Sequence, residues 1–467
     1  MMKKAIVIIM ALILAISMFS GCNMTEIDEE TLGNKVLTKV NGEEILRKEW
    51  SPLYEYYRDM YIQYYNVDPT TTSGQKQLKE LMNNVLNTVV NAKIWEQKAK
   101  EGGFYDFTDE QKAEAKKKVE DAIEEEVKAN AQEMYDAVKG QEGAKDLDYF
   151  IGIAREAYES KMEKNGETID SRVQSQLESD ALDNFKNDQL KDVTPLEADI
   201  YTKYSELKKS QNEDYGAEKD YKAFVTAYNK HSDVIVVNLD GYILVQHILI
   251  KYNTELGEKV TSTSKEYNTA KTEVDDLKEE LKELEEKESP DQEKIDAKKK
   301  EIEDAEKTLD EKKAAYDEAL KNAQASIQTE AEEVLASVQG ADESKFIEIM
   351  LEKSQDTGMA TEEDAKNGYL VGNEDGLMVP FHDGALALKE DGAISGLVAT
   401  DYGYHIIRKI KDVKSGELDL EEVRSEIVDG LTETQKSEKW TSLQDEWYKA
   451  AKIETDKSWL KDFDYNF

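Results

Sequence analysis

The sequence predicts an α+β protein, in which a small antiparallel sheet lies among many helices. Three observations lead to this prediction. Apolar residues recur at helical spacing along most of the 467 residues, a heptad pattern occupies the middle of the chain, and two short apolar segments each contain a histidine. Apolar residues make up 39% and charged residues 35% of the chain, which suits helices with modest cores.

The chain is strongly acidic. Lys and Arg total 61 against 101 Asp and Glu, so the formal net charge is 61 − 101 = −40. A field of this sign repels a phosphate backbone, so we exclude nucleic acid as a partner. On long-range electrostatics alone, the same field favours client proteins with basic or apolar segments.

Residues 1–21 are predicted to be an export signal. Lys3 and Lys4 precede an apolar run from 5 to 19. As a helix, at about 1.5 Å per residue, this run would span roughly 22 Å, which is shorter than the ~30 Å hydrocarbon core of a bilayer. Its length is therefore typical of a signal segment. Small residues then lead to Cys22 in FSGC, which resembles the lipobox of bacterial lipoproteins. The alternative is an ordinary secretory signal.

Cys22 is the only cysteine of the chain. A single cysteine excludes disulfides within the chain and zinc sites built from several thiolates. The lipobox resemblance implies that Cys22 carries the lipid, and two or more acyl chains make a stable anchor. It therefore implies a bacterial protein on the extracytoplasmic face of the cell membrane, with residues 22–34 as a linker.

Residues 35–240 are predicted to form a mostly helical domain. They open with an alternating segment from Val36 to Gly42, in which Asn-Gly is a strong signal for a hairpin turn. Helical spacing follows in five segments: 78–100, 110–139, 146–164, 171–191 and 196–210.

Residues 254–322 are predicted to form an inserted antiparallel helical hairpin, a self-contained coiled coil. Apolar residues recur at alternating spacings of three and four from Tyr267 to Leu284, and every seventh residue from Ile295 to Ala323. The turn sequence KESPDQE separates the two arms. A charged disordered linker is the alternative, and the heptads could also serve a coiled-coil partner as a docking arm.

Two of the four histidines lie in apolar strands. His247 is in LVQHILI, and His405 is in DYGYHII. Without the hairpin, the order over residues 241–413 is strand, helix, helix, short strand, helix and strand. The other two histidines, His231 and His382, have no evident partners and are expected to be exposed.

Five short motifs in this order resemble the parvulin family of peptidyl-prolyl isomerases. They are His247-Ile248-Leu249-Ile250, Ser354-Gln355-Asp356, Gly368-Tyr369-Leu370-Val371, Met378-Val379-Pro380-Phe381 and Gly403-Tyr404-His405-Ile406-Ile407. The resemblance implies that residues 241–413 form a parvulin domain, an antiparallel sheet flanked by helices, interrupted by the hairpin. It also implies cis/trans isomerisation of X-Pro bonds, a reaction that needs no cofactor and no metal because no bond is broken.

The resemblance further implies which residues form the site. The proline pocket would be formed by Leu370, Met378 and Phe381. The catalytic group would comprise His247, Asp356, Thr400 and His405. The imidazoles would bond to each other and to Thr400, with Asp356 near the prolyl amide, so the histidines either act directly or hold the pocket floor.

Some residues depart from the parvulin pattern. Tyr369 replaces an Asp, Val371 replaces a Gly, and Phe381 follows Pro380 one residue early. The hairpin also lies beside the cleft, where phosphate-directed members carry a basic cluster. We therefore expect no preference for phosphorylated Ser/Thr-Pro. These departures leave a catalytically weak or inactive parvulin-fold holdase as the alternative.

The layout around this domain resembles PrsA- and SurA-type foldases. The segments VNGEEILRKEW and 94–111 resemble the opening of their helical chaperone domain. The resemblance implies that residues 414–467 return to pack on that domain. It also implies a membrane-anchored foldase whose partners are unfolded or partly folded exported proteins that contain X-Pro bonds.

Overall fold

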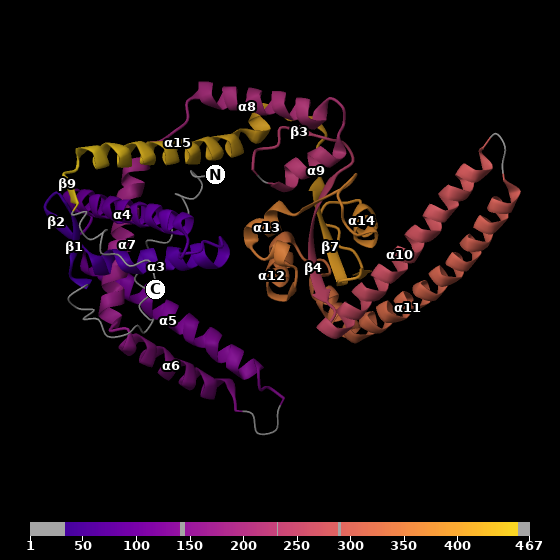
Figure 1. The fold of residues 1–467 in the computed structure, drawn as a ribbon, viewed down its shortest axis with the longest axis horizontal. Helices are drawn as coiled ribbons and strands as arrows, with labels where there is room; N and C mark the ends of the chain where they lie inside the picture. The colour runs from indigo at the N-terminus through magenta and orange to yellow at the C-terminus, as the bar shows by residue number, and fades with distance from the viewer. Residues whose placement is uncertain (1–32, 141–144, 231, 288–290, 456–467) are drawn as a thin grey trace. The chain divides into compact units, whose positions relative to one another are not determined.

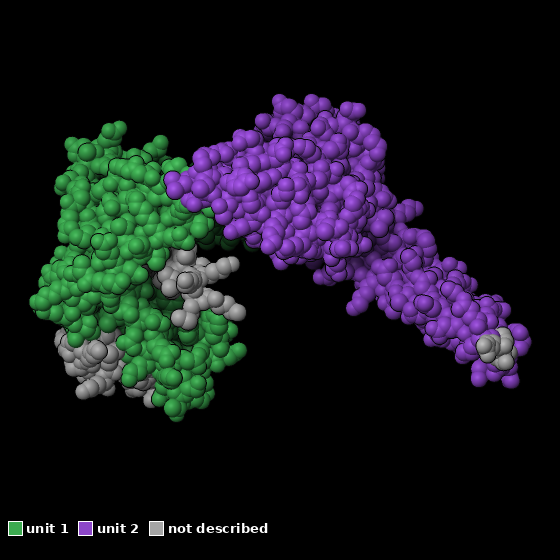
Figure 2. All heavy atoms as spheres, turned by 90° about the horizontal axis from the view of Figure 1, so that it is seen from above, with its two compact units in different colours: residues 1–195, 431–467 green, residues 196–430 purple. Residues whose placement is uncertain are grey.

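A computed structural model describes residues 33–140, 145–230, 232–287 and 291–455. They divide into two compact units, shown in different colours in Figure 2. Unit 1 comprises residues 1–195 and 431–467, and unit 2 comprises residues 196–430. Helices dominate and the sheets are small and antiparallel, so the predicted α+β class is confirmed. Within the described residues, the model has no helix with the length and apolarity needed to cross a membrane.

Unit 1 contains a three-stranded sheet made from both ends of the described chain. β1 (Val36–Val40) pairs with β2 (Glu43–Leu46), and β9 (Ile453–Thr455) pairs antiparallel with β1 on its other side. Asn41 and Gly42 have φ values of 52° and 93°, as expected for the hairpin turn that this dipeptide favours. The C-terminal strand therefore returns to the N-terminal hairpin.

Five helices follow the hairpin in unit 1: α3 (Arg47–Tyr64), α4 (Thr72–Glu101), α5 (Asp109–Asp136), α6 (Leu147–Lys164) and α7 (Ile169–Leu190). The last part of α15 (Leu420–Ala450) joins their core through Trp440, which is 5% exposed. The Trp440 ring lies 5.4 Å from that of Trp95 and 6.2 Å from that of Phe185. Aromatic packing thus joins α15 to α4 and α7.

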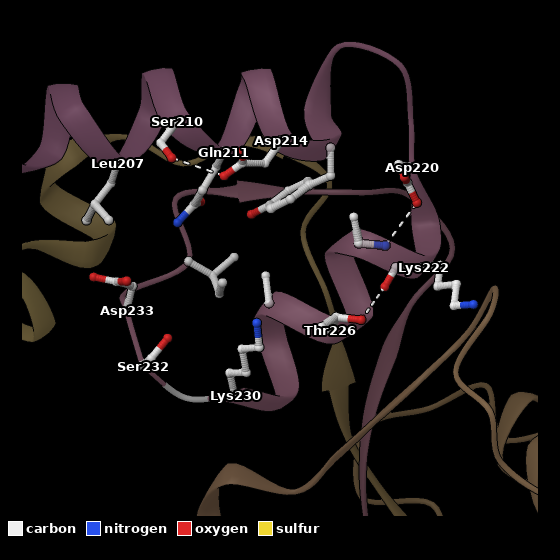
Figure 3. A pocket seen from close by; sticks show the side chains of 14 residues that line it. Leu207, Ser210, Gln211, Asp214, Asp220, Lys222, Thr226, Lys230, Ser232 and Asp233 are labelled. Carbon is white, nitrogen blue, oxygen red and sulfur yellow. Dashed lines mark hydrogen bonds between the residues drawn. The ribbon is translucent and has the colours of Figure 1, made fainter. Parts of the chain in front are cut away.

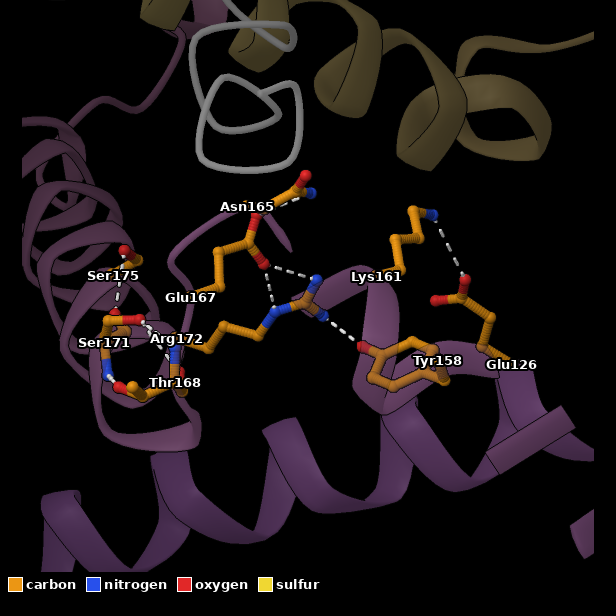
Figure 4. Close-up of polar contacts among 9 residues, drawn as sticks. All are labelled: Glu126, Tyr158, Lys161, Asn165, Glu167, Thr168, Ser171, Arg172 and Ser175. Carbon is orange, nitrogen blue, oxygen red and sulfur yellow. Dashed lines mark hydrogen bonds and ion pairs between the residues drawn. The ribbon is translucent and has the colours of Figure 1, made fainter. Parts of the chain in front are cut away.

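The corner between α6 and α7 is held by a polar cluster (Figure 4). Arg172 Nε donates to Glu167 Oε2 at 2.9 Å, and the same guanidinium donates to the Tyr158 hydroxyl. Thr168 caps α7, because its Oγ1 accepts from the Ser171 backbone N at 3.0 Å. These contacts are local to unit 1 and show no feature of a binding site.

The main sheet of unit 2 is antiparallel, with the order β5-β4-β7-β6. Its strands are β4 (Ile243–Lys251), β5 (Tyr369–Val371), β6 (Val398–Ala399) and β7 (Gly403–Asp412). β4 and β7 form the centre, with His247 opposite Ile407 and His405 opposite Leu249. The two histidine strands are therefore direct neighbours (Figure 1).

Both faces of this sheet are covered, which explains the continuous apolar sequence of β4. On one face, Ile248 and Ile250 join a core with α11 (Gln292–Val338) and α12 (Glu343–Lys353). On the other face, Val245 and Ile407 pack with Phe381 of α14 (Val379–Leu386). The short helix α13 (Glu362–Asn367) leads into β5.

The inserted segment forms two long helices, α10 (Thr254–Glu285) and α11, which extend from the rest of unit 2 (Figures 1 and 2). Ion pairs join Lys278 to Glu306 and Lys312 to Glu266, both at 2.7 Å, so the helices run antiparallel. We expected the inserted hairpin to end at residue 322, but the helix does not end there. α11 continues to Val338 because its apolar positions stay in phase and no helix breaker intervenes.

Residues 196–240 lie in unit 2, whereas we expected them in the helical domain of residues 35–240. They form α8 (Glu197–Gln211), a π-turn, α9 (Tyr221–Lys230) and β3 (Val237–Asn238). β3 pairs with β8 (Gly416–Glu417), and the Tyr215 hydroxyl donates to the Val237 carbonyl at 3.0 Å. Such contacts over the ends of the sheet domain have no periodic signature in the sequence.

Candidate active site

The two strand histidines lie side by side on one face of the sheet. His247 projects from β4 and His405 from β7, and their side chains are buried, with exposures of 2% and 6%. Their Nδ1 atoms are 3.1 Å apart. Because His405 stands opposite Leu249 rather than His247, the two imidazoles meet diagonally across the strands.

Two more predicted residues extend this pair into a row. Thr400 Oγ1 lies 2.9 Å from His405 Nε2, and His247 Nε2 lies 2.7 Å from Asp356 Oδ2. Asp356 is the N-cap of a short 3₁₀ turn after α12, where its Oδ1 accepts from the Gly358 backbone N at 2.9 Å. The row therefore runs Thr400, His405, His247, Asp356.

With both imidazoles neutral, the hydrogen bonds of the row admit one set of tautomers. The ionised Asp356 accepts only, so His247 Nε2 carries a proton and its Nδ1 accepts. His405 Nδ1 then donates to His247, and its Nε2 accepts from the Thr400 hydroxyl. All donors in the row then point toward the carboxylate.

The pKa shifts agree with an ionised Asp356 and a neutral His405. The hydrogen bond from His247 holds the pKa of Asp356 well below its usual range, against the opposing effect of burial, with further help from the Gly358 N–H and the Tyr369 hydroxyl. Burial lowers the pKa of His405 to about 3. Burial is the main cause that raises the pKa of Tyr369, and the hydrogen bond with Asp356 raises it further. The Tyr369 hydroxyl therefore stays protonated and donates to Asp356 Oδ2 at 2.9 Å.

We expect His405 to remain neutral from pH 8 down to pH 5, since its pKa of about 3 lies below the usual 6.5. The unfolded chain binds a proton at this residue below pH 6.5, whereas the folded chain does not. The free energy of unfolding therefore decreases as the pH falls from 6.5 toward 3. The contribution of His405 to this decrease is up to ~1.4 kcal/mol per pH unit. NMR titration of the ring protons, assigned with His405→Gln, checks this. A His405 midpoint near the usual value would contradict it.

A cavity of about 240 Å³ opens above this row. The Phe381 ring stands edge-on to both imidazoles, with centroids 5.0 Å from His247 and 5.1 Å from His405. The other lining residues outside the row are Leu249, Lys251, Tyr369, Leu377, Met378 and Tyr402. The cavity thus combines apolar walls with a hydrogen-bonded polar floor.

Leu370 is the predicted pocket residue that the structure places elsewhere. It is 3% exposed, stands opposite Leu244 of β4, and does not line the cavity. Successive side chains of a strand point to opposite faces, so its neighbour Tyr369 lines the cavity instead. Tyr369 was noted only as a departure from the parvulin pattern, so its place in the cavity was not expected.

His382 is paired rather than exposed, in contrast to our expectation. Its Nδ1 lies 2.7 Å from Asp375 Oδ2, and its side chain is 29% exposed. Asp375 also accepts from the backbone N of Gly372 and Leu377, each at 2.9 Å. The pair therefore fixes the loop that brings Leu377 to the cavity. His231 and the predicted lipidation residue, Cys22, lie outside the described residues.

A larger cavity of about 500 Å³ lies between α8 and α9 but contains none of the predicted residues (Figure 3). Three of its polar side chains are engaged locally: Ser210 with Asp214, Gln211 with the Val234 carbonyl, and Thr226 with the Lys222 carbonyl. In the part of the chain that the structure describes, no group of three or more His, Cys, Asp or Glu side chains could hold a metal ion.

Two protein-family models match the chain. One, described as a SurA-like N-terminal domain, matches residues 1–139, and one described as a PPIC-type PPIase domain matches residues 309–411. The second match includes Asp356, Thr400 and His405. It begins after His247, because the long hairpin separates β4 from the rest of its sheet in the sequence.

Curated relatives match shorter parts of the chain. Foldase protein PrsA of Clostridium botulinum (strain 657 / Type Ba4) is 34% identical over 110 residues, 24% of this chain and 32% of the relative. Putative peptidyl-prolyl cis-trans isomerase Cbf2 of Campylobacter jejuni (strain 81-176) is 31% identical over 116 residues, 24% of this chain and 41% of the relative. The matches thus span about a third to two fifths of these relatives.

Among solved structures, PrsA from Bacillus subtilis is similar at 16% identity and a TM-score of 0.28, covering 92% of this chain and 98% of that chain.

Proposed function

The chain combines a SurA-like N-terminal domain with a PPIC-type PPIase domain, and from this premise we propose that it is a foldase with parvulin-type isomerase activity. It catalyses cis/trans isomerisation of X-Pro bonds and assists the folding of exported proteins. Its clients are unfolded or partly folded chains. Lipid attached to Cys22 anchors it on the extracytoplasmic face of the cell membrane, in keeping with the FSGC segment.

The observation that carries this proposal is the row from Thr400 to Asp356 beneath an apolar cavity. Rotation about the X-Pro bond meets a barrier of roughly 18–20 kcal/mol, because the planar amide is stabilised by resonance. The twisted transition state is less dipolar than the planar amide. An apolar cavity that removes water from the amide therefore favours rotation. Every ~1.4 kcal/mol by which the activation free energy falls raises the rate tenfold.

Each side chain then has a defined task. Met378 and Phe381 hold the prolyl ring, since both are apolar and line the cavity. Asp356 faces the carbonyl oxygen of the rotating amide. Its negative charge raises the energy of the planar amide, whose oxygen carries partial negative charge, more than that of the twisted state. The two imidazoles keep the carboxylate and the floor in place through their hydrogen bonds.

A prolyl isomerase assay tests the proposal. We expect the full chain to accelerate isomerisation of a short X-Pro peptide, measured by protease-coupled or NMR exchange assay. Phe381→Ala should lower kcat/KM by about tenfold, because losing apolar contact with the prolyl ring costs ~1.4 kcal/mol or more. Phe381→Leu retains much of the side-chain volume and should lose less.

Val379→Ala is the matched control for this assay. Val379 starts the same helix but is 70% exposed, so its truncation should leave the rate within about twofold of wild type. Absence of any acceleration by a folded wild-type chain would reject the isomerase. Equal effects of the two alanine variants would reject the assignment of the pocket.

A holdase without isomerase activity is the second candidate. The observation that favours it is the Tyr369 hydroxyl, which bonds to Asp356 Oδ2 inside the cavity. Suppression of client aggregation by a chain that leaves the X-Pro rate unchanged would select this function. Loss of that suppression when the distal hairpin, residues 279–305, is replaced by a short turn would place client binding on the hairpin, because this change retains the contacts at its base.

A further inference from the structure

The helical hairpin is attached directly to the loop that carries Thr400. Asp401, the next residue, accepts hydrogen bonds from Ser264 Oγ of α10 and from the Tyr316 hydroxyl of α11, both at 2.6 Å. The Tyr252 hydroxyl, just before α10, donates to the Thr400 carbonyl at 3.0 Å. The base of the hairpin therefore forms part of the surroundings of the active site.

A groove of about 480 Å³ lies between α10 and this loop. Met378 and Tyr402 line both this groove and the active-site cavity, so the two hollows adjoin at these residues. The α10 side of the groove is formed by residues on successive turns: Thr261, Ser264, Lys265, Asn268, Thr269 and Thr272. We call this set the α10 face.

The α10 face is polar, and its groups are suited to a polypeptide. The hydroxyls of Thr269 and Thr272 bond back to carbonyls of their own helix, at 2.9 and 3.1 Å, so they are already engaged. The Asn268 carboxamide and the Lys265 ammonium offer donors to a ligand, and the carboxamide also offers an acceptor. The Asp401 carboxylate is already engaged by two donors.

The length of the face fits a short extended peptide. From Thr261 to Thr272 the helix rises about 16 Å, at about 1.5 Å per residue. An extended chain advances about 3.3 Å per residue, so about five residues would lie along it. Met378 and Tyr402 line the groove opposite this helix and also border the cavity above the histidines, so a peptide along the helix can extend from a proline in that cavity.

We propose that the α10 face binds the extended segment of substrate next to the proline, with Asn268 on the peptide backbone and Lys265 favouring an acidic side chain. The hairpin is thereby a specificity-determining part of the isomerase. The inference rests on the proposed function, because its ligand is the chain whose proline occupies the cavity.

The test compares short and extended substrates on the full chain. A four-residue X-Pro peptide reaches only the cavity, whereas peptides with five added residues on one side or the other reach the groove. One set of added residues contains a Glu and a matched set contains a Lys. We expect one extended Glu peptide to show a kcat/KM about tenfold above that of the short peptide, a gain of about 1.4 kcal/mol.

The double variant Lys265→Ala/Asn268→Ala should remove most of this gain and leave the short-peptide rate within about twofold of wild type. Lys271→Ala is the matched control, since Lys271 is an exposed lysine of the same helix that does not line the groove. Fluorescence anisotropy of the labelled extended peptide gives a second readout that does not require catalysis.

The outcomes separate the two proposals. No acceleration of the short peptide counts against the isomerase, while anisotropy still reports binding at the groove. A gain on extension that survives the double variant, or no gain and no binding on either side, overturns the assignment of the α10 face. A loss with Lys271→Ala equal to that of the double variant would show a general charge effect and would also overturn it.

Discussion

Replacing Asp356 by alanine is expected to lower kcat/KM for X-Pro isomerisation by about 100-fold, or about 2.7 kcal/mol. The carboxylate is the shared acceptor of His247 Nε2 and the Tyr369 hydroxyl, at 2.7 and 2.9 Å. Its removal leaves two donors without an acceptor, at a cost of ~1–3 kcal/mol each, and takes away the negative charge that faces the amide. Isomerase assays of the folded variant measure the effect.

Tyr369→Phe is the matched control for this substitution. It retains the ring in the cavity and removes one of the two side-chain hydrogen bonds to Asp356, so a loss of about threefold to fivefold is expected. Asp356→Asn retains the shape of the side chain without its charge and should fall between these variants. A wild-type rate in a folded Asp356→Ala chain would remove Asp356 from the mechanism.

Replacing Gly403 by alanine is expected to destabilise the histidine sheet by about 3–5 kcal/mol, which is exceptional for a single methyl group. A Cβ at this position would lie 2.0 Å from the Ile250 carbonyl oxygen and 2.9 Å from Lys251 Cα. Both are backbone atoms of β4, which pairs with β7 here, so neither can move without separating the strands. His405 lies two residues further along β7.

Hydrogen exchange of β4 and β7 measures this effect locally. Protection of their amides should fall by about 100-fold or more, since every ~1.4 kcal/mol of lost stability is a factor of ten. Four of the five tryptophans, at positions 50, 95, 440 and 447, lie in the described part of unit 1, and the fifth, Trp459, lies outside the described residues. Tryptophan fluorescence therefore serves as an internal control that should not change.

Gly396→Ala is the matched control variant, because a Cβ there would meet nothing within 4 Å. It should retain protection within about threefold of wild type. Equal protection in the Gly403 and Gly396 variants would show that the close approach of β7 to β4 is not required.

Much of the architecture was predictable because its signals are local. The hairpin turn at Asn41 and Gly42 depends on two adjacent residues that tolerate positive φ. The antiparallel arrangement of α10 and α11 follows from apolar positions that stay in phase on both sides of a turn. The row of His247, His405 and Thr400 was expected from the parvulin resemblance, and the structure brings these side chains together.

The errors arose where a motif does not specify which way a side chain faces. Leu370 was placed in the pocket by its position in a motif, whereas the pairing of β5 with β4 directs Tyr369 there. The pair of His382 with Asp375 was missed because it depends on a loop conformation. The continuous course of α11 was missed because the end of the insertion was inferred from the heptads alone.

The acidic character, the helical periods and the two histidine strands could be predicted because each depends on composition or on residues near one another in the chain. The set of side chains around the cavity and the contacts by which Asp401 joins the hairpin to the site are established by the packing of the fold. Asp401 and Tyr316 are 85 residues apart in the sequence, and His247 and His405 are 158 residues apart. Contacts over such separations depend on the packing of whole strands and helices, which no short segment specifies.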